Sequence, residues 1–163
     1  MTTQGGQAKK TGNVLEQLVI STLSAHGFPV IKYSDYLKTP EKYDEELLLR
    51  HVPYKTLYGG QGYTEFLLKS QKFELEIRIE CKWQQIAGSV DEKLPHVYLS
   101  AIEAVTENDV IILIDGDGFR DGAIPWIRHI AEQRKYIPKD KQEKNISIMS
   151  STEFLTWCNN KFK

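Results

Sequence analysis

A ten-residue stretch near the middle of the chain alternates strictly between charged and uncharged side chains. Charged residues occupy every even position from Glu74 to Lys82, and apolar residues or cysteine occupy every odd position from Leu75 to Trp83. Successive side chains of a β-strand point to opposite faces of its sheet, so the pattern predicts a strand with one packed face and one charged face. The charged face must be solvated, paired or chemically active.

The remaining patterns predict further strands and helices around this central strand. Runs rich in β-branched and aromatic residues, separated by turn residues, predict strands over residues 52–58, 63–70, 72–84, 109–115 and 145–150. Apolar residues at helical spacing, with capping signals, predict helices over residues 14–26, 89–107, 125–136 and 151–162. Short helical turns interrupted at Pro40 are expected between residues 28 and 50. The order predicts an α/β fold: a central mixed sheet with an antiparallel meander, flanked by helices on both faces.

The chain has the length and composition of one globular domain. Its 163 residues are 40% hydrophobic and 26% charged, which is ordinary for a soluble protein. We expect a flexible polar arm at residues 1–12 and a single domain at residues 13–163. The longest apolar run, residues 110–114, is too short to cross a membrane, and the N-terminal residues do not resemble a signal peptide, so we expect a cytoplasmic location. Cys81 and Cys158 are expected to be free thiols.

The chemistry that the charged face can perform is concentrated at its end. Glu80 and Lys82 are two residues apart, so their carboxylate and ammonium groups lie on the same side of the strand. A carboxylate can hold Mg²⁺, and a neighbouring lysine can orient water or offset charge on a phosphoryl group. Glu65, on the preceding strand of the meander, is the candidate for a second carboxylate. This is a scaffold for hydrolysing a phosphodiester.

The arrangement resembles the PD-(D/E)XK nuclease superfamily. In that family a helix glutamate, an acidic strand residue and a (D/E)-x-K tripeptide on the next strand converge on a divalent metal. The resemblance assigns Glu80 and Lys82 to the tripeptide and Glu16 to the helix glutamate. Glu65 stands at the first acidic position, where the family usually has aspartate. The matching order of elements begins at about residue 13 and continues to the end of the chain.

The resemblance also implies accessory groups, a cofactor and a substrate. Gln84 is similar to a glutamine found in many branches of the family, and the backbone carbonyl of Cys81 is expected to face the metal. The implied activity is that of a restriction-endonuclease-like DNA endonuclease that uses Mg²⁺, with Mn²⁺ as a substitute. We expect Lys93, Arg120 and Arg128 to contact DNA.

Several of these assignments have alternatives in the sequence. Glu16 follows Asn13 by three residues and would also complete a helix capping box. The charges of the central strand would also form a solvated cross-strand ladder. Glu74 or Glu76 would replace Glu65 as the second carboxylate.

The function has alternatives as well. A formal net charge of −1 provides no overall attraction to nucleic acid, so binding must rely on a local patch. A ribonuclease, or an inactive nucleic-acid-binding or interaction module with the same fold, is an alternative to a DNA endonuclease. Cleavage of both strands with one site per chain would favour a homodimer, whereas nicking needs only a monomer.

Overall fold

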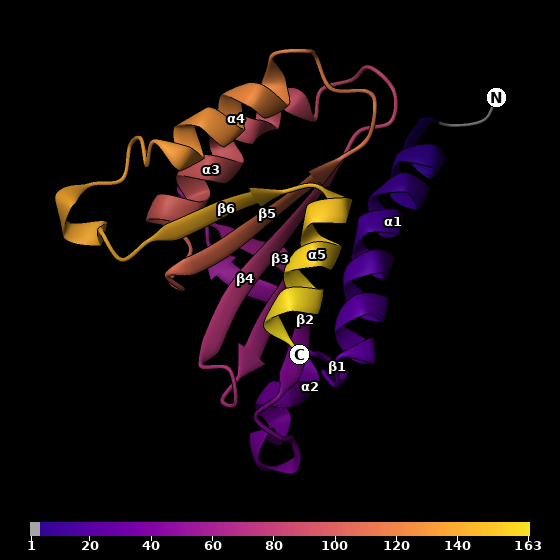
Figure 1. Cartoon of the computed structure of the whole chain (residues 1–163), viewed down its shortest axis with the longest axis vertical. Coiled ribbons are helices and arrows are strands. Elements are labelled where there is room, and N and C mark those ends of the chain that lie inside the picture. The colour runs from indigo at the N-terminus through magenta and orange to yellow at the C-terminus, as the bar shows by residue number, and fades with distance from the viewer. Residues whose placement is uncertain (1–3) are drawn as a thin grey trace.

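The computed structural model describes the backbone of residues 4–163 and the side chains from residue 14 onward. Within this range the chain forms a six-stranded sheet with the strand order β1-β2-β3-β4-β5-β6 and helices on both faces (Figure 1). The strands are β1 (Val30–Lys32), β2 (Leu47–Lys55), β3 (Gln61–Ser70), β4 (Leu75–Trp83), β5 (Asp109–Asp115) and β6 (Asn145–Met149). The α-helices are α1 (Gln4–Ala25), α2 (Tyr33–Lys38), α3 (Leu94–Glu103), α4 (Ala123–Glu132) and α5 (Ser151–Lys161).

The sheet is mixed, as the sequence predicts. Strands β2, β3 and β4 form an antiparallel meander, and β4, β5 and β6 run parallel to one another. Strand β1 also pairs parallel with β2. A parallel pair needs a crossover connection; α3 and α4 lie in the two between β4, β5 and β6, and α2 lies in the connection between β1 and β2. The expected α/β fold with an antiparallel meander is therefore confirmed.

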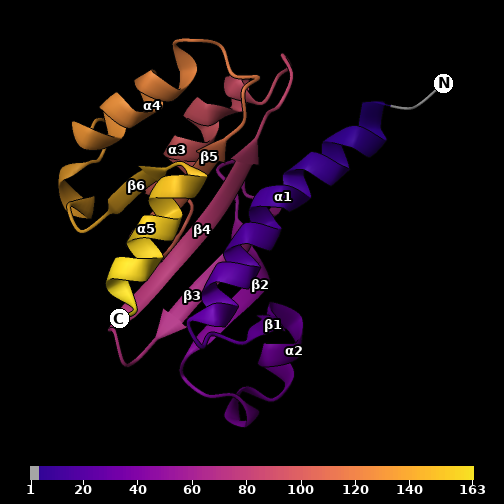
Figure 2. The same cartoon turned by 45° about the vertical axis from the view of Figure 1, so that its right-hand side comes forward.

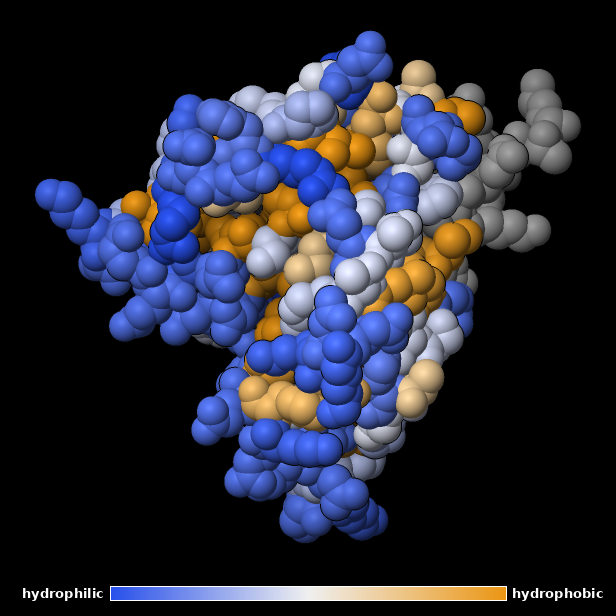
Figure 3. All heavy atoms as spheres, in the orientation of Figure 1, coloured by the Kyte–Doolittle hydropathy of each residue, from blue (hydrophilic) through white to orange (hydrophobic). Residues whose placement is uncertain are grey.

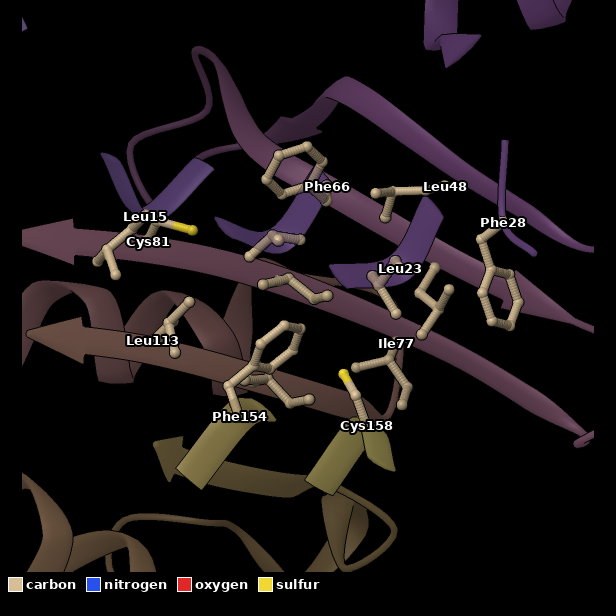
Figure 4. Close-up of a cluster of buried hydrophobic side chains, with 14 residues drawn as sticks. Leu15, Leu23, Phe28, Leu48, Phe66, Ile77, Cys81, Leu113, Phe154 and Cys158 are labelled. Atoms are coloured by element: carbon tan, nitrogen blue, oxygen red, sulfur yellow. The ribbon is translucent and has the colours of Figure 1, made fainter. Parts of the chain in front are cut away.

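The two faces of β4 meet different layers of the molecule. Ile77, Ile79 and Cys81 pack against α1 and α5, where Figure 4 shows Leu15, Phe154 and Cys158 on the same side of the sheet. Helices α1 and α5 lie together on this face in both Figure 1 and Figure 2. The two cysteines are buried and free, as expected.

The opposite face of the sheet is covered by α3 and α4. Alternate residues of β5, including Val110 and Ile112, pack here against Tyr98 and Ile127, whereas Ile111 and Leu113 face the α1 side. The apolar run of β5 is continuous because both of its faces are buried. None of the described helices combines the length and apolar composition needed to span a membrane.

The strand at one edge of the sheet, β6, is short and leaves apolar side chains at the surface. A shallow groove between β6 and α5 is lined in part by Ile148, Met149 and Trp157. Figure 3 shows hydrophobic atoms between the more hydrophilic surfaces on either side of this region. A short edge strand limits the length over which another chain can pair with it.

Helix boundaries differ from the sequence predictions at both ends: α3 ends at Glu103 rather than at residue 107, and α4 ends at Glu132 rather than at residue 136. Helix α1 begins at Gln4 rather than at residue 14, and ends near the expected Gly27, whose φ of 92° suits a left-handed stop. Residues 1–3 of the expected arm lie outside the described residues. The sequence predicts a capping box at residues 89–92, at the start of the helix expected over residues 89–107. These residues do not cap a helix, because α3 begins at Leu94 with no side-chain cap. By contrast, Ser150 and Glu153 form the expected capping box of α5. The short strand β1 was not predicted.

A buried ion pair joins the charged face of β4 to the segment after α3. The guanidinium of Arg78 donates to both carboxylate oxygens of Glu107 at 2.8 and 2.9 Å, and the two side chains are only 4% and 10% exposed. The same guanidinium donates to Thr64 Oγ1 on β3 and to the carbonyl of Val52 on β2. The solvated ladder was therefore the wrong interpretation for Arg78, which links three strands to the crossover.

The buried carboxylate of this pair stays ionised. Burial raises the pKa of Glu107, but the hydrogen bonds and charge of Arg78 outweigh burial and hold that pKa below its ordinary range. Lys144 donates to the carbonyls of Val105 and Glu107, which fixes the same segment from the other side.

We expect Glu107→Ala to lower the free energy of unfolding by about 3–5 kcal/mol, because it leaves the buried Arg78 charge without a partner. Asp35→Ala, which breaks the exposed Lys38–Asp35 pair, is the control and should cost less than about 1 kcal/mol. Chemical denaturation of the two variants measures both effects. Equal losses would show that the Arg78–Glu107 pair contributes no more than a surface ion pair.

Candidate active site

Glu80 and Lys82 lie together on the face of β4 that is turned toward α3. The ammonium of Lys82 donates to Glu80 Oε1 at 2.5 Å, and the two side chains are about four-fifths buried. The strand period places both groups on this face, and the pairing of β4 with β3 and β5 keeps the strand extended. The solvated ladder is therefore also wrong for this pair.

Glu65 reaches the same place from β3. Its Oε2 accepts a hydrogen bond from the backbone N–H of Cys81 at 2.9 Å, so the carboxylate is anchored between Glu80 and Lys82 along β4. The register that pairs Phe66 with Ile79 brings Glu65 next to Glu80. The structure thus gathers two carboxylates and one ammonium from two neighbouring strands.

The electrostatics of the cluster follow from burial and from the two like charges. Burial, with the nearby charge of Glu80, raises the pKa of Glu65 to about 8. Burial lowers the pKa of Lys82, but the carboxylates of Glu80 and Glu65 outweigh it, and the pKa is raised overall. Lys82 is therefore a cation at neutral pH, and burial beside Glu80 disfavours a second negative charge on Glu65.

Glu74 and Glu76, the alternative second carboxylates, lie away from this cluster. Glu74 is in the turn before β4, and Glu76 pairs in register with Lys69 near the start of the strand. Four residues of extended strand separate Glu76 from Glu80, roughly 13 Å. Of the three candidates, Glu65 is therefore the carboxylate that lies beside Glu80.

Glu16 approaches from the α1 face of the sheet. Its neighbour Leu15 packs in the core near Cys81 (Figure 4), and the charge of Glu16 contributes, after burial and the two strand carboxylates, to a raised pKa of the Cys81 thiol. The capping interpretation of Glu16 is wrong, because Asn13 lies within α1 rather than at its start. Glu16 is half-buried and lies near the strand end that carries the cluster.

Gln84 is buried behind the cluster and holds two loops together. Its amide nitrogen donates to the carbonyl of Gly118 at 2.7 Å, and its oxygen accepts from the N–H groups of Val90 and Asp91. An added Cβ at Gly118 would lie 2.4 Å from the carbonyl oxygen of Ile86, so only glycine permits this approach. Gln84 positions the loop after β4, and a direct part in catalysis stays a prediction.

The three residues expected to contact DNA lie in different places. Lys93 is exposed and lines a pocket beside Glu80 and Lys82. Arg120 is paired with Asp91 and Glu92, and Arg128 donates to both carboxylate oxygens of Glu153 on α5. DNA contacts by these side chains stay predictions, and the structure brings only Lys93 to the cluster.

The pocket beside the cluster includes residues that the sequence did not single out. It has a volume of about 390 Å³ and opens between the sheet and α3. The period-two pattern of β4 already placed Arg78 on this face, but nothing local in the sequence indicated Tyr54, Thr64 or Ser100. Those three come from β2, β3 and α3, and only the packing of the layers brings them together.

The donor set is compatible with a hard divalent cation. Among the residues with described side chains, no three His, Cys, Asp or Glu side chains gather as a metal site. Mg²⁺ is commonly bound by one or two protein carboxylates and keeps several waters. Glu65 and Glu80 provide two carboxylates; burial first, and then the charge of Glu80, raises the pKa of Glu65, and a bound cation would favour the ionised form of both.

Comparison with known families agrees with this geometry. A family model described as the PD-(D/E)XK nuclease superfamily domain matches residues 7–162. Comparisons with curated proteins and with solved structures found no match. Because the family model covers nearly the whole chain, and Glu65, Glu80 and Lys82 gather on two neighbouring strands, the chain belongs to the PD-(D/E)XK nuclease superfamily.

Proposed function

We propose that this protein is a divalent-metal-dependent endonuclease that hydrolyses phosphodiester bonds in DNA. The observation that carries the proposal is the convergence of Glu65, Glu80 and Lys82 beside an open pocket. Members of the superfamily generally use divalent metal ions. Mg²⁺ is the proposed cofactor, and Mn²⁺ is the proposed substitute.

Glu65, Glu80 and the backbone carbonyl of Cys81 are the proposed metal ligands. When bound, the ion would polarise the phosphoryl group and lower the pKa of a water molecule. Glu65 accepts a backbone hydrogen bond and Glu80 accepts from Lys82, so both carboxylates are already oriented. Their orientation costs little additional side-chain entropy when the ion binds.

Lys82 is the proposed group for positioning water and offsetting negative charge. Its ammonium is held on the Glu80 side of the pocket and is positively charged at neutral pH. A fixed cation in a largely buried site interacts more strongly with nearby negative charge than a cation in water does, because the effective dielectric constant of the site is lower. Exposed Lys93 and His96 on the same pocket wall are the proposed contacts for neighbouring phosphates.

The basic test is cleavage of plasmid DNA by the purified protein in Mg²⁺ or Mn²⁺, with EDTA as the control. Metal-dependent nicking or linearisation supports a nuclease. Binding of DNA without cleavage in either metal would instead support the inactive nucleic-acid-binding module.

Glu80→Gln should abolish metal-dependent cleavage, because a neutral amide is a poor ligand for Mg²⁺. The substitution keeps the shape of the side chain and an oxygen that can accept from Lys82, so the fold should be retained, while loss of the buried ion pair should lower the thermal stability. Glu76→Gln, on the exposed start of the same strand, is the matched control and should cleave normally. Full activity of Glu80→Gln would remove the central claim.

Lys82→Ala should bind DNA in Ca²⁺ nearly as well as wild type but cleave in Mg²⁺ on the order of 100-fold more slowly. The reason is that a contact made in the transition state appears in turnover and not in ground-state binding. Single-turnover cleavage and a Ca²⁺ binding titration at matched salt measure the two quantities. Weakened binding with an unchanged cleavage rate would assign Lys82 to DNA binding alone.

Glu16→Gln should keep stability and lower cleavage by about 10- to 100-fold at limiting metal, as is typical for a residue that supports metal ligands. Glu16 is half-buried within α1 and does not cap the helix, so a loss of activity cannot be attributed to a lost cap. Gln17→Glu, at the exposed neighbouring position, is the control. Wild-type cleavage by Glu16→Gln at every metal concentration would exclude Glu16 from the site.

A further inference from the structure

The pocket between α3 and the sheet has more volume than a single phosphate group would fill. Its volume of about 390 Å³ lies within the range of about 300–1,000 Å³ that is usual for sites that enclose small organic groups. Glu80 and Lys82 line one side of it. Whatever occupies the pocket therefore lies next to the group that these two residues contact.

Most of the pocket wall is apolar. Helix α3 and the segment after it contribute Val97, Ala101 and Val105, and β5 contributes Val110 and Ile112. A phosphate or a sugar would lose its hydration against such a wall without gaining hydrogen bonds. An apolar, largely planar group fits the wall better.

One side of the pocket is a fixed aromatic ring. Tyr54 on β2 pairs with Gly62 on β3, and a Cβ added at Gly62 would lie 3.0 Å from the Tyr54 ring. The ring therefore lies against bare backbone, which restricts its movement. Aromatic rings held in this way are stacking platforms for nucleobases.

A buried polar atom in the wall lacks a partner. Ser100 on α3 is 6% exposed and lines the pocket, and its hydroxyl has no hydrogen-bond partner among the described residues. Buried hydroxyl groups are normally hydrogen-bonded, so an unpaired one calls for an explanation. Among the lining residues, Ser100 is therefore the one with an unpaired buried hydroxyl.

We propose that this pocket receives one unpaired nucleobase of the DNA strand that is cut, next to the scissile phosphate. The proposal rests on the proposed nuclease function and adds a substrate class: single-stranded DNA, or duplex DNA in which one base is displaced from the stack. A nucleobase is joined to its phosphate through a single sugar. The side chains of Glu80 and Lys82 line the pocket, so a base in the pocket would lie close to a phosphate that contacts these two residues. A base that remains paired and stacked cannot enter a pocket that lies between a helix and a sheet.

Basic side chains at the pocket rim complement such a strand. Lys82, Lys93 and His96 lie on the pocket wall, and Tyr58 of the β2–β3 turn lies 6.3 Å from the ring of His96 while being 93% exposed. Cations that follow the backbone and aromatic groups that take the bases are the usual combination in single-strand binding.

The test fills the pocket without touching the catalytic cluster. Val97→Phe places a ring into the pocket from a half-buried position on α3. Leu99→Phe adds the same bulk at a position of the same helix that is 37% exposed and outside the pocket, and it serves as the matched control. Circular dichroism and thermal melting verify that both variants fold.

Binding is measured in Ca²⁺ by fluorescence anisotropy with three labelled probes of equal length. The probes are a thymidine homopolymer, the same strand paired with deoxyadenosine homopolymer, and a strand of abasic nucleotides. Wild type and Leu99→Phe should bind the single strand more tightly than the duplex or the abasic strand. Val97→Phe should lose on the order of 10-fold in affinity for the single strand and should bind the abasic strand as wild type does.

The outcomes separate this inference from the proposed function. Cleavage of either plasmid or the labelled single strand in Mg²⁺ tests the nuclease function without any assumption about the pocket. If either substrate is cleaved but Val97→Phe binds all three probes as Leu99→Phe does, the base pocket is overturned and the nuclease function stands. An equal loss by Val97→Phe on the abasic strand would also overturn it, because that loss would not depend on a base.

Discussion

The structure depends on the pleat of β4, which divides its residues between two chemically different layers. Odd-numbered residues such as Ile77, Ile79 and Cys81 are buried against α1 and α5. Even-numbered residues Arg78 and Glu80 face the α3 side. The strand lies between β3 and β5, so both of its edges are paired and its register cannot slip without exchanging the two faces.

Charges on the α3 face are retained because each one has a partner. Arg78 is neutralised by Glu107, and Lys82 contacts Glu80. Burial of a charge is costly unless it is paired and hydrogen-bonded, and the pairs on this face meet that condition. The exception is Glu65, whose pKa is raised by burial and then by the nearby charge of Glu80, which leaves the site electrostatically suited to a cation.

The loops that connect the strands hold the candidate site in place as much as the strands themselves do. Gln84 binds the loop after β4 to the loop after β5, and Arg78 with Lys144 fixes the segment between α3 and β5. These contacts position α3 over the sheet and so determine the width of the pocket. A site built on strands and tied by buried hydrogen bonds holds its groups more closely than one built on loops alone.

The sequence alone determined the strand pattern, the α/β class, and the shared face of Glu80 and Lys82, because side-chain periodicity and a two-residue spacing are local properties. It also placed Glu65 and Glu16 as candidates, through the order of the elements. Only the tertiary structure decided that Arg78 is buried, that Gln84 supports loops, and that Tyr54 and Ser100 line a pocket. Those roles depend on contacts between residues far apart in the chain, which arise from strand register and helix packing and leave no local pattern.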